Sequence, residues 1–74
     1  MDLNVFYENV EAERARKGWT IAECAEYLGI DEKTYRNRNY ACTDIRVSAL
    51  IDYATVFNCS TDYLLGLTDT VRVK

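Results

Sequence analysis

The chain contains no proline and only three glycines, at positions 18, 29 and 66. Before Gly29, the residues Ile21, Cys24, Ala25 and Leu28 recur at the spacing of one face of an α-helix. A glycine directly after such a segment is typical of the left-handed position that ends a helix. The pattern therefore predicts an all-α chain in which the glycines mark helix ends.

Polar residues that cap helices predict where the helices begin. Thr20 and Glu23 have the spacing of a capping box, and Asp31 and Ser60 are N-caps of further segments. Residues 39–44 lack a helical period and are expected to form a loop. The expected helices cover residues 4–17, 21–28, 32 to about 39, 46–57 and 61–65. The fourth has the strongest period, and its expected inward residues are Val47, Leu50, Ile51, Ala54 and Phe57.

The length of 74 residues bounds the functions that the chain can carry. A domain of this size buries about 60% of its unfolded surface, and a ligand pocket of about 300 to 1,000 Å³ would hollow out much of its core. The sequence has no histidine, no glycine-rich phosphate loop and no pair of carboxylates typical of acid–base catalysis. Three cysteines at long spacings give neither a disulfide framework nor a zinc site. We therefore expect no enzyme activity, no cofactor and no metal.

The distribution of charge predicts a cytoplasmic protein without a membrane span. The longest stretch without Asp, Glu, Lys or Arg is the nine residues Tyr53–Thr61, and a span needs about 18 apolar residues. The chain opens with the acidic Asp2 and lacks the apolar run of a secretory signal. The formal net charge is −3, but basic residues concentrate at positions 14–17 and 33–46.

Two predicted helices joined by a tight turn, over about residues 20–39, have the spacing of a helix-turn-helix. In that motif the second helix enters the major groove of DNA. Here the second helix has one large apolar residue, Tyr35, to face the core. Its other side chains must face outward, and five of them can contact DNA: Lys33, Thr34, Arg36, Asn37 and Arg38.

The order of residues resembles that of the lambda-repressor-like (XRE) family of helix-turn-helix proteins. The residues that carry the resemblance are Phe6, Arg14, Gly18, Thr20, Glu23, Ala25, Leu28-Gly29-Ile30, Thr34, Leu50, Ala54, Phe57 and Asp62-Tyr63-Leu64-Leu65-Gly66-Leu67-Thr68-Asp69. The resemblance implies an all-α, five-helix domain over residues 1–69, followed by a tail at 70–74. It also implies sequence-specific binding of duplex DNA and a role as a transcriptional regulator, with repression the expected effect.

The residue types in the third helix indicate their partners on DNA. Arginine donates two hydrogen bonds to the O6 and N7 edge of guanine, and asparagine pairs with the N6 and N7 edge of adenine. These rules assign base contacts to Arg36, Asn37 and Arg38, and a phosphate or guanine contact to Lys33. The simpler interpretation of the same side chains is a solvated helix face.

Four further residues have two possible roles each. Thr34 can meet a thymine methyl group or a phosphate, and Glu32 can accept from cytosine or only stabilise the helix dipole. Thr20 is first a helix cap and second a phosphate contact. Tyr40, expected in the loop after the third helix, can touch a phosphate or pack on a protein partner.

Three residues are expected to hold the fold rather than to contact DNA. Tyr35 attaches the third helix to the core. The resemblance implies that Arg14 packs against the third helix as a hydrogen-bond donor. In the family its partner is the glutamate of a Trp-Glu pair, and here Asn39 stands at that place. Arg14 is therefore expected to lack its carboxylate and to donate one hydrogen bond to Asn39.

The partners of the chain are expected to include a second copy of itself. One recognition helix reads too few base pairs to be selective, and a homodimer on a two-fold site solves this. The candidate dimer surfaces are Leu64, Leu65 and Leu67, or the tail at residues 70–74. A protein-interaction module of the antirepressor kind stays open as an alternative, since the net charge is −3 and Ile21 stands where the family has glutamine.

Overall fold

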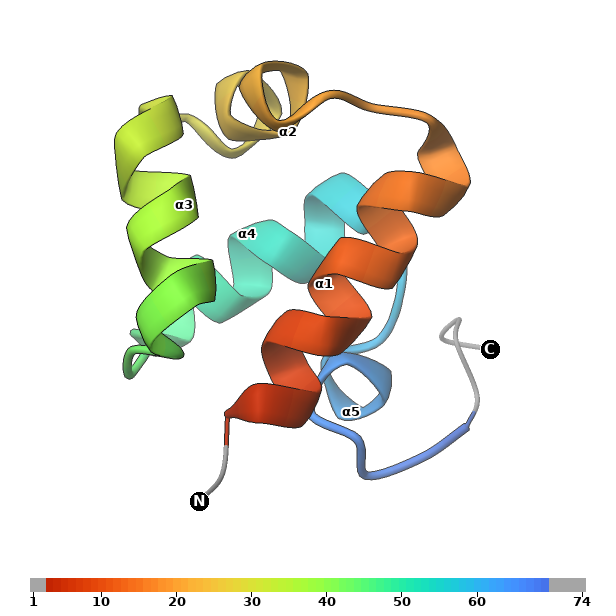
Figure 1. Cartoon of the computed structure of the whole chain (residues 1–74). Coiled ribbons are helices and arrows are strands. Elements are labelled where there is room, and N and C mark those ends of the chain that lie inside the picture. Colours follow the sequence, from red (N-terminus) through yellow and green to blue (C-terminus); the bar gives the residue numbers. More distant parts are fainter. Residues whose placement is uncertain (1–2, 70–74) are drawn as a thin grey trace.

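The computed structural model describes residues 3–69 of the chain, which contain five α-helices and no strand (Figure 1). The predicted all-α class is confirmed, and the tail predicted at residues 70–74 lies outside the described residues. Within residues 3–69 no helix combines the length and the apolar character that crossing a bilayer requires. The helices are α1 (Asn4–Lys17), α2 (Ile21–Leu28), α3 (Glu32–Ala41), α4 (Val47–Phe57) and α5 (Thr61–Leu64).

The predicted N-caps are confirmed at three helices. The Thr20 hydroxyl accepts a hydrogen bond from the Glu23 amide at 3.1 Å, and the Glu23 carboxylate accepts one from the Thr20 amide at 2.9 Å. Asp31 caps α3 by accepting from the Thr34 amide at 2.7 Å, and the Ser60 hydroxyl caps α5. Each bond satisfies an amide that the first turn of a helix leaves without a partner.

The prediction of a loop at residues 39–44 is wrong in its first half, because α3 continues to Ala41. The period of apolar residues gave no sign of this continuation, since only Tyr35 of α3 is buried. The helix ends at Cys42, which adopts the left-handed conformation with φ of 49°. The loop is therefore shorter than predicted, and Tyr40 lies in the last turn of the helix.

Substitution of Cys42 by glycine is expected to stabilise the protein by about 1 kcal/mol. A non-glycine residue in the left-handed region costs roughly 1–2 kcal/mol, and the greater freedom of glycine in the unfolded chain offsets part of the gain. Thermal unfolding followed by circular dichroism measures the difference. The matched control is Cys42→Ala, which removes the thiol but keeps the strain, and an equal gain from both substitutions would contradict this account.

The core lies between α1 and α4, which cross near the centre of the molecule (Figure 1). Phe6 of α1 packs edge-to-face on Tyr53 of α4, with ring centroids 5.4 Å apart. The helix α5 packs against both α1 and α4, and α2 and α3 pack together. In Figure 1, α3 forms one outer edge of the molecule. The largest fully buried side chains are Tyr35, Tyr53, Phe6, Phe57, Leu64, Val10 and Cys24.

The inward face of α4 differs from the prediction. Val47 and Ile51 were expected in the core, but they are 72% and 53% exposed, while Tyr53 is 1% exposed. The aromatic ring of Tyr53 fills the centre of the core beside Phe6 and Phe57. The helix therefore turns its Tyr53 side inward, and two aliphatic side chains remain on its surface.

One acidic side chain of α1, which sequence reasoning did not place in the core, is buried. Glu13 accepts a hydrogen bond from the Tyr63 hydroxyl at 3.3 Å and pairs with Arg16 at 3.0 Å. These partners offset the cost of burying its charge. Leu64 is also part of the core, so it cannot contribute to a dimer surface as predicted.

Candidate nucleic-acid interface

The turn between α2 and α3 places the two helices in close succession. Gly29 ends α2 in the left-handed conformation, and its amide donates to the Glu26 carbonyl at 3.0 Å. The next amide, of Ile30, donates to the Ala25 carbonyl at 3.0 Å, and Asp31 then caps α3. Two turn residues and one cap thus fix the start of α3 relative to α2.

A single buried side chain attaches α3 to the core. Tyr35 is fully buried, and its hydroxyl donates a short hydrogen bond to the carboxylate of Glu11 on α1. One turn further along α3, the Asn39 amide nitrogen donates to the same carboxylate at 3.2 Å. One face of α3 therefore docks on α1 through polar contacts to one acidic residue.

The carboxylate of Glu11 is the partner that sequence reasoning missed for Arg14. Arg14 donates to it through Nε at 3.0 Å and Nη2 at 3.1 Å, and donates to the Trp19 carbonyl through Nη1 at 2.7 Å. The predicted bond from Arg14 to Asn39 is wrong, because Asn39 is itself a donor to Glu11. Arg14 thus reaches α3 only through Glu11. The spacing of Glu11 and Arg14, three apart on a helix, was the available signal.

The contacts at Glu11 shift the ionisation of both partners. Burial raises the pKa of Glu11, but the hydrogen bonds from Arg14 and Tyr35 outweigh burial and leave that pKa below its ordinary value. Burial raises the pKa of Tyr35 strongly, and the bond to Glu11 raises it further. At neutral pH the pair is therefore a carboxylate and a neutral phenol that donates to it.

Acidification is expected to weaken the docking of α3 through Glu11. A carboxyl whose pKa is lower in the folded state stabilises the fold above its unfolded pKa of 4.5. That stabilisation is lost as the pH falls through the folded pKa. Urea unfolding at pH 7 and pH 3 measures it, and Glu11→Gln should show a smaller decrease between the two pH values than the original chain. Equal decreases in both proteins would show that Glu11 makes no pH-dependent contribution.

The outward side of α3 carries most of the predicted contact residues. Arg36 and Glu32, one turn apart, form an ion pair of 2.7 Å between side chains that are both more than 40% exposed. Tyr40 is 94% exposed. The exposed residues on this side, which we call the α3 outer face, are Glu32, Lys33, Arg36, Asn37 and Tyr40.

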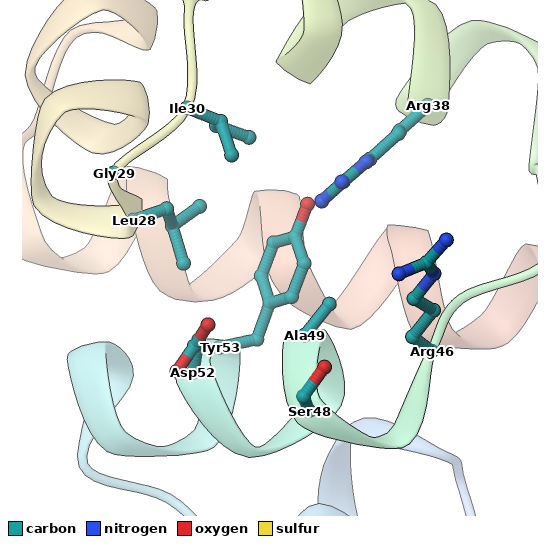
Figure 2. Close-up of a pocket in the computed structure, with 9 residues that line it drawn as sticks. All are labelled: Leu28, Gly29, Ile30, Arg38, Arg46, Ser48, Ala49, Asp52 and Tyr53. Carbon is teal, nitrogen blue, oxygen red and sulfur yellow. The ribbon is translucent and has the colours of Figure 1, made fainter.

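The other predicted contact residues do not join the α3 outer face. Thr34 is half-buried, and Thr20 is exposed at the start of α2, where its hydroxyl serves the capping box. Arg38 is half-buried, and its guanidinium points toward the hydroxyl of Tyr53 rather than outward (Figure 2). The structure thus brings five of the eight predicted residues together and separates three.

A cavity of about 420 Å³ lies beside Arg38, between the turn after α2 and the start of α4 (Figure 2). Arg46, the N-cap residue of α4, also lines it, and sequence reasoning assigned no contact to this arginine. The fold of the loop after α3 brings Arg38 and Arg46 to one cavity. Their spacing in the sequence does not predict that they meet there. The lining residues are Leu28, Gly29, Ile30, Arg38, Arg46, Ser48, Ala49, Asp52 and Tyr53.

Comparisons of the chain with known protein families, with curated proteins and with solved structures found no match.

Proposed function

We propose that this protein is a sequence-specific regulator of transcription, expected to repress, that inserts α3 into the major groove of duplex DNA. The observation that carries the proposal is the α3 outer face, a row of exposed polar side chains on a helix with only Tyr35 buried. The short turn from α2 fits the helix-turn-helix arrangement of a lambda-repressor-like domain. A position at the outer edge of the molecule leaves α3 free to enter a groove (Figure 1).

The α3 outer face supplies both kinds of contact that DNA recognition uses. Arg36 and Asn37 read base edges, and Lys33 contacts a phosphate or guanine. The ion pair with Glu32 holds the Arg36 guanidinium in place, and Glu32 can itself accept from cytosine. Tyr40 projects from the last turn toward the backbone of the duplex. Contacts from Thr34 and from Thr20 at the start of α2 go to phosphates.

Titration of the protein into a fluorescent duplex from the region upstream of its own gene tests the proposal. Fluorescence anisotropy is measured at 50 and 200 mM salt, with a scrambled duplex as the control. The α3 outer face carries two basic residues, Lys33 and Arg36, so a dimer presents four cations to the phosphates, and affinity should fall by about 100-fold between the two salt concentrations. No binding at the lower salt concentration, or equal binding to the scrambled duplex, would contradict the proposal.

A protein-interaction module on the same fold is the second candidate, and the surface of α4 favours it. Val47 and Ile51 lie one turn apart and are both exposed, and adjacent exposed apolar side chains can form part of an interaction surface. If the protein is a DNA-binding dimer, we expect a second copy of the chain to cover these two side chains. Sedimentation and DNA-binding measurements on Ile51→Lys and on the original chain distinguish the two candidate functions. Loss of both the dimer and DNA binding in the variant supports the regulator. Capture of a different protein without any DNA binding supports the module.

A further inference from the structure

The cavity beside Arg38 gathers cationic and hydrogen-bond-donating groups from two helices. Arg38 comes from α3 and Arg46 from the N-cap position of α4. Within the described residues neither guanidinium forms an ion pair with a carboxylate. Two arginines that share a cavity repel one another, and an anion between them would remove that repulsion.

The first turn of α4 adds backbone donors to the same cavity. No side chain caps this helix of 11 residues, so the amides of Val47, Ser48 and Ala49 have no partner from a cap. Ser48 and Ala49 line the cavity. An uncapped helix start also carries the positive end of the helix dipole, which favours a bound anion.

A buried hydroxyl that lines the cavity has no acceptor within residues 3–69, and this second observation points to a ligand that can accept a proton. Tyr53 is 1% exposed and lines the cavity, and no acceptor among the described residues takes the proton of its hydroxyl. The Arg38 guanidinium points toward this hydroxyl (Figure 2), but arginine is only a donor and cannot take the phenol proton. A buried hydroxyl without an acceptor destabilises the folded protein. An anion in the cavity would accept this proton together with those of the arginines.

The other lining residues indicate what the anion is attached to. Leu28, Ile30 and Ala49 give the cavity an apolar wall, which suits an organic group rather than a bare ion. Asp52 is the one acidic lining residue, and Figure 2 shows it across the Tyr53 ring from Arg46. The volume of about 420 Å³ lies within the usual range of small-molecule pockets.

We infer that this cavity binds the phosphate group of a small phosphorylated molecule, held by Arg38, Arg46, the Tyr53 hydroxyl and the amides at the start of α4. The inference does not depend on DNA binding. Because the ligand would bridge Arg38 of α3 and Arg46 of α4, its binding would fix α3 relative to α4. A small phosphorylated molecule would thus be an effector of the α3 outer face.

The test is a titration of the ¹⁵N-labelled protein with three probes: inorganic phosphate, adenosine monophosphate and adenosine. Binding is measured from the changes in the amide chemical shifts of Ser48 and Ala49. Saturable shifts with either phosphate probe, and none with adenosine, support the inference. Tighter binding of the monophosphate identifies a phosphate ester as the ligand, and equal binding identifies free phosphate. No saturable shift with either phosphate probe, or equal binding of adenosine, would overturn it.

Two variants and a matched control locate the binding. Arg46→Ala should weaken phosphate binding by about tenfold, the usual loss for one charge-assisted hydrogen bond. Tyr53→Phe should also weaken binding, and because it removes a buried hydroxyl that has no acceptor in the described part of the chain it should not destabilise the free protein. Lys17→Ala removes an equal charge at the end of α1, outside the cavity, and should leave phosphate binding unchanged. Equal affinities in the Arg46 and Lys17 variants would overturn the inference.

Discussion

The substitution Arg36→Glu is expected to weaken binding to the upstream duplex by about 100-fold or more. A bidentate contact of arginine to guanine contributes about 1–3 kcal/mol of discrimination, and the new carboxylate would also be repelled by the phosphates. The folded domain should change little in stability, because Arg36 and its partner Glu32 are exposed. Exposed ion pairs contribute about 0–1 kcal/mol. Fluorescence anisotropy and thermal unfolding measure the two effects separately.

The control for Arg36→Glu is Lys17→Glu, which changes the net charge by the same amount at the end of α1. It removes a contact of the Lys17 ammonium with the Trp19 ring but touches no residue of the α3 outer face. An equal loss of DNA binding in both variants would mean that net charge, and not α3, governs binding. Unchanged binding in Arg36→Glu would mean that α3 is not the recognition helix.

Removal of the Tyr35 side chain should give the largest loss of stability among the substitutions considered. Truncation of a fully buried aromatic residue to alanine costs about 3–5 kcal/mol, and domains of this size unfold at roughly 4–11 kcal/mol. Tyr35→Ala would also take away the only buried side chain of α3 and one donor to Glu11. Urea unfolding followed by circular dichroism measures the loss.

The variant Tyr35→Phe separates the two roles of this residue. It keeps the ring in the core and removes only the hydroxyl that donates to Glu11, so the expected loss is about 1–2 kcal/mol. Asn37→Ala, an exposed change on the same helix, should change stability by less than about 0.5 kcal/mol. If Tyr35→Ala destabilised no more than Asn37→Ala, the attachment of α3 through Tyr35 would be refuted.

Local signals in the sequence predicted the helix starts, and they failed where packing decides the result. Thr20, Asp31 and Ser60 act on amides three residues away, so their roles depend only on neighbouring sequence. The side of α4 that faces inward depends on how Tyr53 fits beside Phe6 from another helix. The spacing of aliphatic residues along α4 does not predict how Tyr53 packs against Phe6.

The candidate site was predictable to a similar extent. The α3 outer face follows from helical spacing around one apolar residue, Tyr35, and this needs no tertiary information. The partnership of Glu11 with Tyr35 and Asn39 joins residues 24 and 28 positions apart in the chain. The cavity of Arg38, Arg46 and Tyr53 likewise exists only once α3 and α4 are placed together. Contacts between residues so far apart in the chain cannot be predicted from a single sequence.

The attachment of α3 by its inner side alone has a consequence for how this protein can diverge. Tyr35 and Asn39 hold the helix on α1, and all five residues of the α3 outer face are exposed. Its five positions can therefore be exchanged one at a time while the scaffold keeps its stability. Grafting another set of side chains onto residues 32, 33, 36, 37 and 40 would therefore change what this surface can contact without redesign of the interior.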